Sequence, residues 1–458
     1  MSRIRTITIS TTLALGLGIA LLWALGAQSQ TATAAQAVEP SSALARTRVE
    51  IPRAPTAELH VCPAGCPYAS VQAAVDAAAP GSVLKVAAGT YTDLHTRDGF
   101  TQVVYISKTV TLQGGYTTAN GFADPPDPDA NPTILDAQGK GRVIVILDAG
   151  PAIEGFTITG GYVEKPGGVG SGGGIYIHSA SPTIRDNWIV DNSADGDGGA
   201  IFVNRGSAQI LENRIVGNTA TWAGGLRIIN DADVQIVGNL IEGNVAQNTG
   251  GGIDLECCGG TTPLIARNVI LNNDGSARGG GIIVNATYAR LVNNVLAGNR
   301  ATDGAGLFLE GSAGYPVSVT LIHNTLAGGP SGGEALWVGT YVTATLVNNV
   351  VFSHTVGLTN TAPSSAVVTA DYTLFDTTGV PYGSGVSSAH EFSGDLAFVN
   401  PSEGDYHLGR GSAAIDQGTP TGVTDDLDGD PRPTGPLPDL GADEVQRCVF
   451  LPLVLRGF

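Results

Sequence analysis

Short runs that alternate apolar and polar residues, separated by glycines and asparagines, fill the middle of this chain. The phrase GGGIYIHSASPTIRDNWIVDN at residues 172–192 returns as GGAIFVNRGSAQILENRIVGN at 198–218 and as GGLRIINDADVQIVGNLIEGN at 224–244. Alternation with a period of two indicates β-strands. Each unit contains two or three runs of strand length and no run of helix length.

The asparagines recur at a step of 25 to 30 residues. One file is Asn187, Asn213, Asn239, Asn268, Asn294, Asn324 and Asn349, and a second is Asn192, Asn218, Asn244, Asn273 and Asn299. A fixed period in this range is typical of repeat architectures. Leucine-rich repeats would show an L-x-x-L-x-L frame, and WD-type blades need longer units. The pattern therefore predicts an all-β parallel β-helix with one coil per repeat and coils about 4.8 Å apart.

Stacked coils place equivalent side chains above one another, so a corner asparagine can bond to its copy in the next coil. Asparagine also tolerates the left-handed backbone that a sharp corner requires. The glycine pairs would supply positive φ at the other corner. We therefore expect both asparagine files to be structural, with each ladder bond contributing about 0.5–1.5 kcal/mol.

Ahead of the repeats, Ser70 is expected to cap a short helix whose apolar face, Val71, Ala74, Val75 and Ala78, plugs the end of the stack. The stretch rich in proline and aspartate at 123–132 is predicted to be a surface excursion. The chain then divides into a signal peptide at 1–37, a linker at 38–59, a cap and first coils at 60–132, β-helix repeats at 133–355, C-terminal coils with a closing region at 356–445, and an apolar tail at 446–458.

The N-terminal segment is typical of an export signal. Arg3 and Arg5 precede an apolar stretch from Leu13 to Leu25, and small residues follow it. The alternative is an uncleaved anchor helix, because the apolar stretch approaches bilayer length. Either form predicts a secreted or cell-surface protein, and the apolar tail is a sorting signal or a capping strand.

The net charge of the chain limits the classes of molecule that it is expected to bind. Twenty-three basic against 41 acidic residues give a net charge of −18, which disfavours nucleic acid and anionic membranes and suits cations and neutral sugars. Five cysteines are compatible with an oxidising compartment. Cys62 and Cys66 could close a small loop, Cys257 and Cys258 form a vicinal disulfide or remain thiols, and Cys448 is the odd one.

The segments SVQAAVDAAAPGSVLKVAAGTY, TVTLQGG and IEGFTITGG, together with the N-x-[IVL] coils, resemble the right-handed parallel β-helix superfamily typified by pectate lyases. The resemblance covers about residues 60 to 400 and implies the fold more than an activity. The segment at 413–444 resembles the choice-of-anchor Q domain of exported bacterial proteins. Its matching residues are Asp416, Asp428, Gly429, Arg432, Pro433, Asp439, Gly441 and Glu444.

Alignment of the coils on their glycine pairs predicts two outward columns on one sheet. The first is Tyr176, Phe202, Arg227, Asp254, Ile283, Phe308 and Trp337, and the second is His178, Asn204, Ile229, Glu256, Asn285, Glu310 and Gly339. One hypothesis is a sugar-binding groove formed by Tyr176, His178, Phe202, Asn204, Asn285, Phe308, Glu310 and Trp337. The alternative is an ordinary sheet face whose aromatic rings stack on one another.

Asp254 and Glu256 lie two residues apart on one predicted strand, about 6.5–7 Å between Cα atoms. Carboxyl groups at such separations can serve as acid and base in glycoside hydrolysis. Arg227 would lie one coil away and could hold a substrate carboxylate. A structural ion pair explains the same residues without catalysis. The catalytic motifs of polygalacturonases and the calcium cluster of pectate lyases are not matched.

No cofactor is required by any motif, and calcium is the one metal hypothesis. A loose calcium site could use Asp426, Asp428, Asp430 and Asp439, although the spacing excludes an EF-hand. The alternative is a turn in which Arg432 pairs with a nearby carboxylate. The sequence thus predicts an exported, monomeric β-helix protein that binds a polysaccharide or cell-surface glycan or acts as a scaffold. The alternative functions are a polysaccharide lyase or glycoside hydrolase, and an adhesin.

Overall fold

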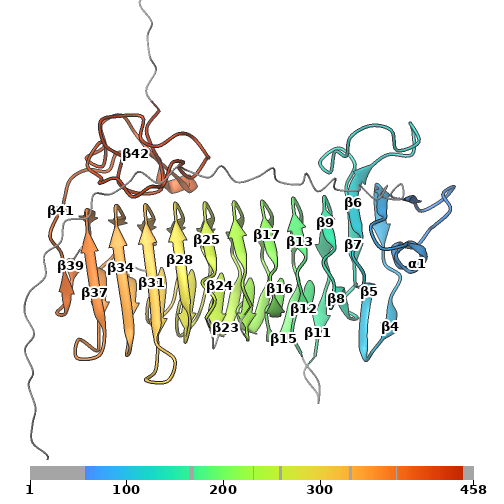
Figure 1. The fold of residues 1–458 in the computed structure, drawn as a ribbon, viewed down its shortest axis with the longest axis horizontal. Helices are drawn as coiled ribbons and strands as arrows, with labels where there is room; N and C mark the ends of the chain where they lie inside the picture. The colour runs from blue at the N-terminus through green and yellow to red at the C-terminus, as the bar shows by residue number, and fades with distance from the viewer. Residues whose placement is uncertain are drawn as a thin grey trace, which may run out of the picture. The chain divides into compact units, whose positions relative to one another are not determined.

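The computed structural model describes residues 57–164, 170–230, 232–256, 260–329, 333–377 and 379–446 of the 458. These residues wind as a stack of β-coils (Figure 1). The predicted signal peptide, most of the linker, Cys257, Cys258, Cys448 and the tail beyond Gln446 lie outside the described residues. No helix among the described residues is long and apolar enough to cross a bilayer.

Three long sheets run along the stack, and strands of successive coils are neighbours in each. Sheet A contains β1 (Glu58–Val61), β2 (Val83–Ala87), β6 (Thr111–Tyr116), β9 (Ala152–Glu154), β13 (Thr183–Arg185), β17 (Gln209–Leu211), β21 (Gln235–Val237), β25 (Leu264–Ala266), β28 (Tyr288–Val292), β31 (Val317–Ile322), β34 (Val342–Val347), β37 (Val367–Asp371) and β40 (Val386–Ser387). Sheet B contains β3 (Gly89–Tyr91), β7 (Thr133–Asp136), β10 (Thr157–Thr159), β14 (Trp188–Val190), β18 (Arg214–Val216), β22 (Leu240–Glu242), β26 (Val269–Leu271), β29 (Val295–Ala297), β32 (Thr325–Ala327), β35 (Val350–Phe352), β38 (Thr373–Asp376) and β41 (Glu391–Phe392).

Sheet C forms the third side of the coils. In the central coils, a strand of a short sheet D comes directly before each strand of sheet C along the chain. Sheet C contains β4 (His95–Arg97), β5 (Phe100–Ile106), β8 (Arg142–Leu147), β12 (Ile175–Ala180), β16 (Ile201–Gly206), β20 (Leu226–Ile229), β24 (Ile253–Glu256), β27 (Ile282–Asn285), β30 (Leu307–Glu310), β33 (Glu334–Val338), β36 (Val356–Asn360) and β39 (Val380–Tyr382). Sheet D contains β11 (Tyr162–Val163), β15 (Ser193–Asp197), β19 (Thr219–Trp222) and β23 (Val245–Thr249). The strands pair in parallel, apart from the antiparallel pair β4–β5. The predicted parallel β-helix is confirmed.

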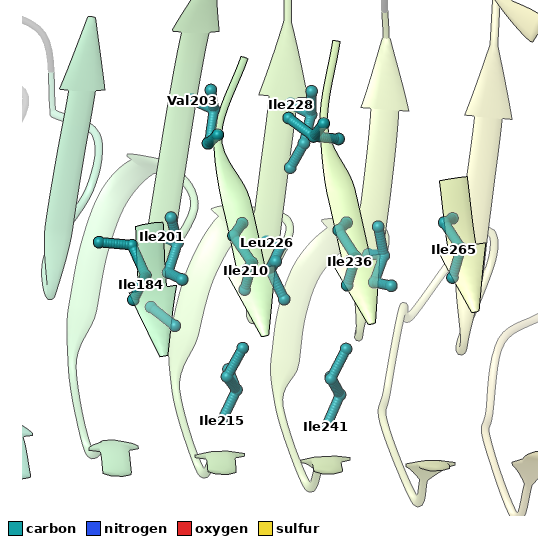
Figure 2. Packing of buried hydrophobic residues seen from close by; sticks show 14 of the residues in the cluster. Ile184, Ile201, Val203, Ile210, Ile215, Leu226, Ile228, Ile236, Ile241 and Ile265 are labelled. Carbon is teal, nitrogen blue, oxygen red and sulfur yellow. The ribbon is translucent and has the colours of Figure 1, made fainter. Parts of the chain in front are cut away.

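The interior of the coils is filled by columns of identical or similar apolar side chains. Ile184, Ile210, Ile236 and Ile265 are register partners on four consecutive strands of sheet A, and all are fully buried. Figure 2 shows these isoleucines beside those contributed by sheets B and C. Because like residues stack directly, each coil buries its apolar face against the next, and the alternation in the sequence becomes inside against outside.

The predicted cap helix is present as α1 (Val71–Ala77), and the Ser70 hydroxyl accepts a hydrogen bond from the Ala73 N–H at 3.4 Å. Val71, Ala74 and Val75 join the same apolar cluster as the first strands. The helix therefore covers the open end of the coil interior. A disulfide joins Cys62 and Cys66, as the spacing suggested.

Both predicted asparagine ladders are confirmed. In the first, each Nδ2–H donates to the Oδ1 of the next coil's asparagine at 2.9–3.1 Å, from Asn187 to Asn349. The second ladder does the same from Asn192 to Asn299. Each Oδ1 also accepts the backbone N–H of the asparagine before it, as Asn239 does from Asn213 at 2.8 Å. The ladders therefore satisfy buried backbone groups at two corners of the central coils and at one corner of the coils that follow Asn299.

One detail of the corner prediction is wrong. The left-handed residue is the one that precedes each ladder asparagine, for example Asp186 (φ 54°), Glu212 (φ 55°) and Asn293 (φ 53°). The ladder asparagine comes after the bend, because its side chain must point into the stack to reach both neighbouring coils. The glycine pairs do supply positive φ at the other corner, as at Gly198 (φ 63°), although Ala223 (φ 57°) takes that place in one coil.

The C-terminal closing region, residues 393–446, folds back over the corner between sheets A and B. Its regular elements are the antiparallel pair β42 (Phe398–Asn400) and β43 (Asp405–Leu408) and the 3-10 helix η1 (Pro401–Glu403). In Figure 1 it lies in red along one edge of the later coils. Leu396, Leu408 and Leu440 pack on Val350 and Leu374.

Polar contacts fasten this region to the left-handed corner residues of the later coils. Asp425 pairs with Arg267 at 3.2 Å, and its carbonyl accepts from Asn293. Arg432 donates to Nδ1 of buried His323, and Asn348 Nδ2 donates to the Thr419 carbonyl at 2.7 Å. Burial, together with the charge of Arg432, lowers the pKa of His323 to about 2, so this imidazole is a neutral acceptor at physiological pH.

Replacement of one ladder asparagine should be costly. Asn239→Ala would leave the buried Asn213 N–H without its acceptor and would remove the amide N–H that Asn239 donates to the Ile210 carbonyl. We expect a loss of about 2–4 kcal/mol in the free energy of unfolding, measured by urea denaturation. Asn248→Ala, at an exposed position in the same coil, is the matched control and should change the free energy by less than about 0.5 kcal/mol. Equal effects of the two substitutions would contradict a stabilising ladder.

Candidate functional site

The outer face of sheet C has the two columns of side chains that were predicted by aligning the coils on their glycine pairs. Register partners follow the order Tyr176, Phe202, Arg227, Asp254, Ile283, Phe308 and Trp337 in the first column. The second column runs His178, Asn204, Ile229, Glu256, Asn285 and Glu310. The residues between the columns are buried in the coil interior. The coil alignment read from the glycine pairs is therefore confirmed.

The aromatic part of the sugar-binding hypothesis is wrong for three rings. Tyr176, Phe202 and Phe308 are only 5%, 2% and 3% exposed. Tyr176 stacks on Phe202 with ring centroids 5.4 Å apart, and Phe308 stacks on Trp337 at 4.4 Å. A sugar needs a free ring face, and here the rings are stacked on one another along the column.

The turn before each strand explains this burial. Gly198 has positive φ, and a Cβ added to it would lie 3.1 Å from the Cα of Phe202. The turn therefore folds back onto the first outward position of the strand. The second column escapes this cover, and His178, Asn204, Asn285 and Glu310 are half-buried. Glu310 accepts from the Thr340 hydroxyl at 2.8 Å. A sugar-binding role for these four residues and Trp337 stays a prediction.

Arg227, Asp254 and Glu256 come together as predicted, but in one ion-pair cluster. The Arg227 guanidinium donates to Asp254 and to Glu256 and lies 3.5 Å from Asp197 of the preceding coil. Asp254 is 1% exposed, whereas the Glu256 side chain is partly exposed. Burial, opposed by Arg227 and reinforced by the charge of Glu256, raises the pKa of Asp254 to about 6.

This geometry fits a structural brace better than an acid–base pair. Both carboxylates bind the same guanidinium, and the inner one is closed to a polymer chain. Arg227 is itself buried, so removal of either partner would leave an uncompensated charge inside the turn. The catalytic role proposed for the three residues stays a prediction, and the bonds seen here need no catalysis to explain them.

A second concave site lies at the corner of sheets A and B near the start of the stack. The excursion between β6 and β7, teal in Figure 1, folds back so that the Asp127 N–H donates to the Gly115 carbonyl at 2.8 Å. Pro128 packs against Gly155, where a Cβ would come within 3.0 Å of the ring. The excursion forms one wall of a groove of about 470 Å³. The groove is lined by Gln113, Gly114, Pro126, Pro128, Asp129, Glu154, Gly155, Arg185, Asp186, Asn187, Trp188, Glu212 and Arg214.

Trp188 is the aromatic residue of this groove, and it is 44% exposed. The Arg214 guanidinium covers part of its ring at 4.8 Å from the centroid. Trp188 is not among the binding residues predicted from the sequence. Its signal is an aromatic side chain directly after a ladder asparagine, where the other coils carry arginine, leucine, valine or threonine. Because only the fold brings the excursion to the same corner, the groove could not be read from the repeats.

Two of the four carboxylates in the proposed calcium site, Asp426 and Asp439, are already bound by backbone N–H groups. Asp426 Oδ1 accepts from the Asp428 and Asp430 N–H groups at 3.0 and 2.9 Å, and its Oδ2 accepts from the Glu444 N–H. Asp439 accepts from the Asp416 and Val445 N–H groups. These two carboxylates point at backbone donors, which is the role of a turn anchor. The alternative was a turn in which Arg432 pairs with a nearby carboxylate. It is supported because Arg432 Nε lies 3.8 Å from the carboxylate of Glu444.

Asp428 has different partners from those expected. Its Oδ2 lies 2.8 Å from Nε2 of His407, and Asp443 lies beside both residues. Burial lowers the pKa of His407, but hydrogen bonds to Asp405 and Asp428 outweigh it and raise the pKa to about 9. The spacing Asp405-x-His407 is visible in the sequence, while Asp443 follows 35 residues after Leu408, and only folding brings it near.

Stacked parallel coils with ordered corner ladders define a parallel β-helix protein. The chain belongs to the family described as "Protein of unknown function (DUF1565)", which matches residues 62–306. No curated protein matches the sequence.

Among solved structures, the one titled "Crystal structure of pectate lyase Pel9A" aligns with 85% of this chain and 97% of its own, with a TM-score of 0.53 and 15% identity. At this identity the likeness shows the fold alone. A second, "The complex structure of XylC with xylose", covers 66% of this chain and 69% of its own at 13% identity, and its TM-score of 0.36 supports no inference.

The ion-pair cluster should leave a signature in the pH dependence of stability. Because the pKa of folded Asp254 is about 6 against an ordinary 3.8, its protonated form stabilises the fold below pH 4, and this contribution is lost as the pH rises through 6. In the Asp254→Asn variant, the asparagine side chain has no carboxyl group and does not titrate. The free energy of unfolding of the wild type, relative to Asp254→Asn, should fall by about 2–3 kcal/mol from pH 4 to 7.5.

The measurement is urea unfolding of both proteins across this pH range. Glu256→Gln is the companion variant, and it should move the step to lower pH because the negative charge of Glu256 raises the Asp254 pKa. Parallel curves for wild type and Asp254→Asn would show that folding does not raise the pKa of Asp254.

Proposed function

We propose that this is an exported β-helix protein that binds a neutral polysaccharide in the groove between the proline-rich excursion and the corner at Trp188. The observation that carries the proposal is an exposed tryptophan inside a concave site bordered by amide, carboxylate and guanidinium groups. Sugar rings pack on aromatic faces, and their hydroxyls bond to such polar groups. The pectate lyase-like fold is consistent with a glycan ligand.

Charge favours a neutral sugar over a polyuronate. The groove is lined by four carboxylates and two guanidinium groups, one of which stacks on Trp188. Arg185 is further neutralised by Asp186 at 2.9 Å. A net charge of −18 on the whole chain would also repel an anionic polymer.

The closing region supports the export part of the proposal. The residues that resemble the choice-of-anchor Q domain form one hydrogen-bonded unit, in which Glu444 accepts from the Asp439 and Thr434 N–H groups and Arg432 donates to the Asp439 and Ala442 carbonyls. We therefore propose that residues 413–444 are such a domain and that the protein is secreted or held at the cell surface.

Binding should depend on Trp188. Trp188→Ala should weaken affinity for soluble glucomannan or xylan by about tenfold or more, because removal of the one aromatic platform in the groove costs at least about 1.4 kcal/mol. Affinity electrophoresis and isothermal titration would measure the loss. Trp222→Ala is the matched control, since Trp222 is 37% exposed on β19 and does not line the groove.

Three further measurements distinguish a protein that binds a neutral glycan from a polysaccharide lyase or hydrolase. Polygalacturonate should bind more weakly than the neutral polymers. No reducing ends or unsaturated uronate should form, and Glu256→Gln should leave binding unchanged, whereas a lyase or hydrolase would release product that Glu256→Gln abolishes. Equal binding by wild type and Trp188→Ala would overturn the proposed groove.

A further inference from the structure

A histidine and three carboxylates converge in the closing region, away from the groove. His407 on β43, Asp428 in the turn at 425–431 and Asp443 in the last described segment each offer a ligand atom, and these atoms lie within 4.8 Å of one another. In the part of the chain that the structure describes, this is the one such grouping of three.

The histidine is held in the orientation that a metal ligand needs. Its Nδ1 lies 2.6 Å from Asp405 Oδ1, and the same oxygen accepts the His407 backbone N–H. With Nδ1–H donated to Asp405, Nε2 is the nitrogen that faces Asp428 and Asp443. Histidines that bind metals commonly donate their other N–H to a carboxylate in this way.

The two carboxylates are also positioned by groups outside the cluster. Asp443 is 7% exposed, and its Oδ2 accepts the Leu408 N–H at 2.7 Å, which fixes the side chain against β43. The Asp428 backbone N–H donates to Asp426, so the turn holds Asp428 over His407. Asp428 and His407 are partly exposed, which leaves one side of the cluster open to solvent.

Three carboxylates, Asp405, Asp428 and Asp443, surround one histidine ring, and Asp443 is nine-tenths buried. A histidine nitrogen and carboxylate oxygens that converge from separate segments are ligand types that divalent transition metals accept.

We propose that His407, Asp428 and Asp443 bind a divalent transition-metal ion, zinc in the first place, with Asp405 as the positioning residue for His407. One imidazole nitrogen with carboxylate oxygens suits zinc and its neighbours, whereas calcium takes oxygen ligands. Zinc bonds of about 2.0–2.2 Å need ligand atoms roughly 3.3 Å apart. A small rotation of the exposed Asp428 opens the present 2.8 Å contact to that spacing.

Such an ion would join three separate segments of the closing region. The ligands come from β43, from the turn that contacts Arg267, and from the segment in which Ala442 bonds to Thr325 of β32. Metal binding would therefore stabilise the cover over the later coils, independently of any glycan in the groove.

The test uses the full chain without a histidine tag, treated with chelator and then titrated with zinc in a calorimeter. We expect one zinc per chain and a higher melting temperature with zinc than with chelator. His407→Gln and Asp428→Asn should each weaken zinc binding at least tenfold. Asp405→Asn should weaken it about tenfold while keeping the absorption bands of bound cobalt.

His390→Gln is the matched control, because His390 pairs through Nδ1 with Asp371 at 2.8 Å but belongs to no group of three ligand residues in the described part of the chain. It should bind zinc like the wild type. Absence of saturable zinc binding, equal binding by His407→Gln and wild type, or saturation by calcium but not zinc would each overturn the proposal and leave a plain ion-pair network. Circular dichroism of each variant confirms that the coils remain folded.

Discussion

Registered stacking of the coils is the constraint on which everything else in this protein depends. Parallel strands bond only to the coil before and the coil after, so a slip in one coil would displace every column above it. The asparagine ladders prevent this slip because each amide bonds to groups in both neighbours. The ladder continues through the longer repeats, with Asn239 to Asn268 at 3.0 Å and Asn294 to Asn324 at 2.9 Å. Insertions are therefore confined to loops outside the coil section.

Register also decides what can happen on the outer faces. Side chains of equal position become neighbours at strand spacing, so aromatic residues in adjacent coils stack and opposite charges pair. Phe308 on Trp337, and Arg227 between Asp197 and Asp254, are two results of the same rule. The positive-φ turns then fold over the first outward position. This combination converts a column that looks like a binding face into a second, external layer of packing.

The left-handed corner residues make different contacts in the two halves of the stack. In the later coils they are Arg267, Asn293, His323 and Asn348, and each contacts the closing region. In the earlier coils the same column holds Asp186 and Glu212, which border the groove instead. One column of corner side chains thus fastens the cover over one half of the stack and leaves the other half accessible.

The repeats by themselves determined the coil architecture, the cap helix, both ladders and the pairing order on sheet C, because period, alternation and stacking are local consequences of the sequence. They could not determine which outward residues are buried. Burial depends on how each turn folds back over the strand that follows it, and this is why Tyr176 and Phe202 are buried although their outward position predicts exposed rings. Only the tertiary structure brought Trp188 under the proline-rich excursion and Asp443 beside His407. Contacts between segments far apart in the chain depend on how loops fold back over the stack, and no periodic pattern encodes that path.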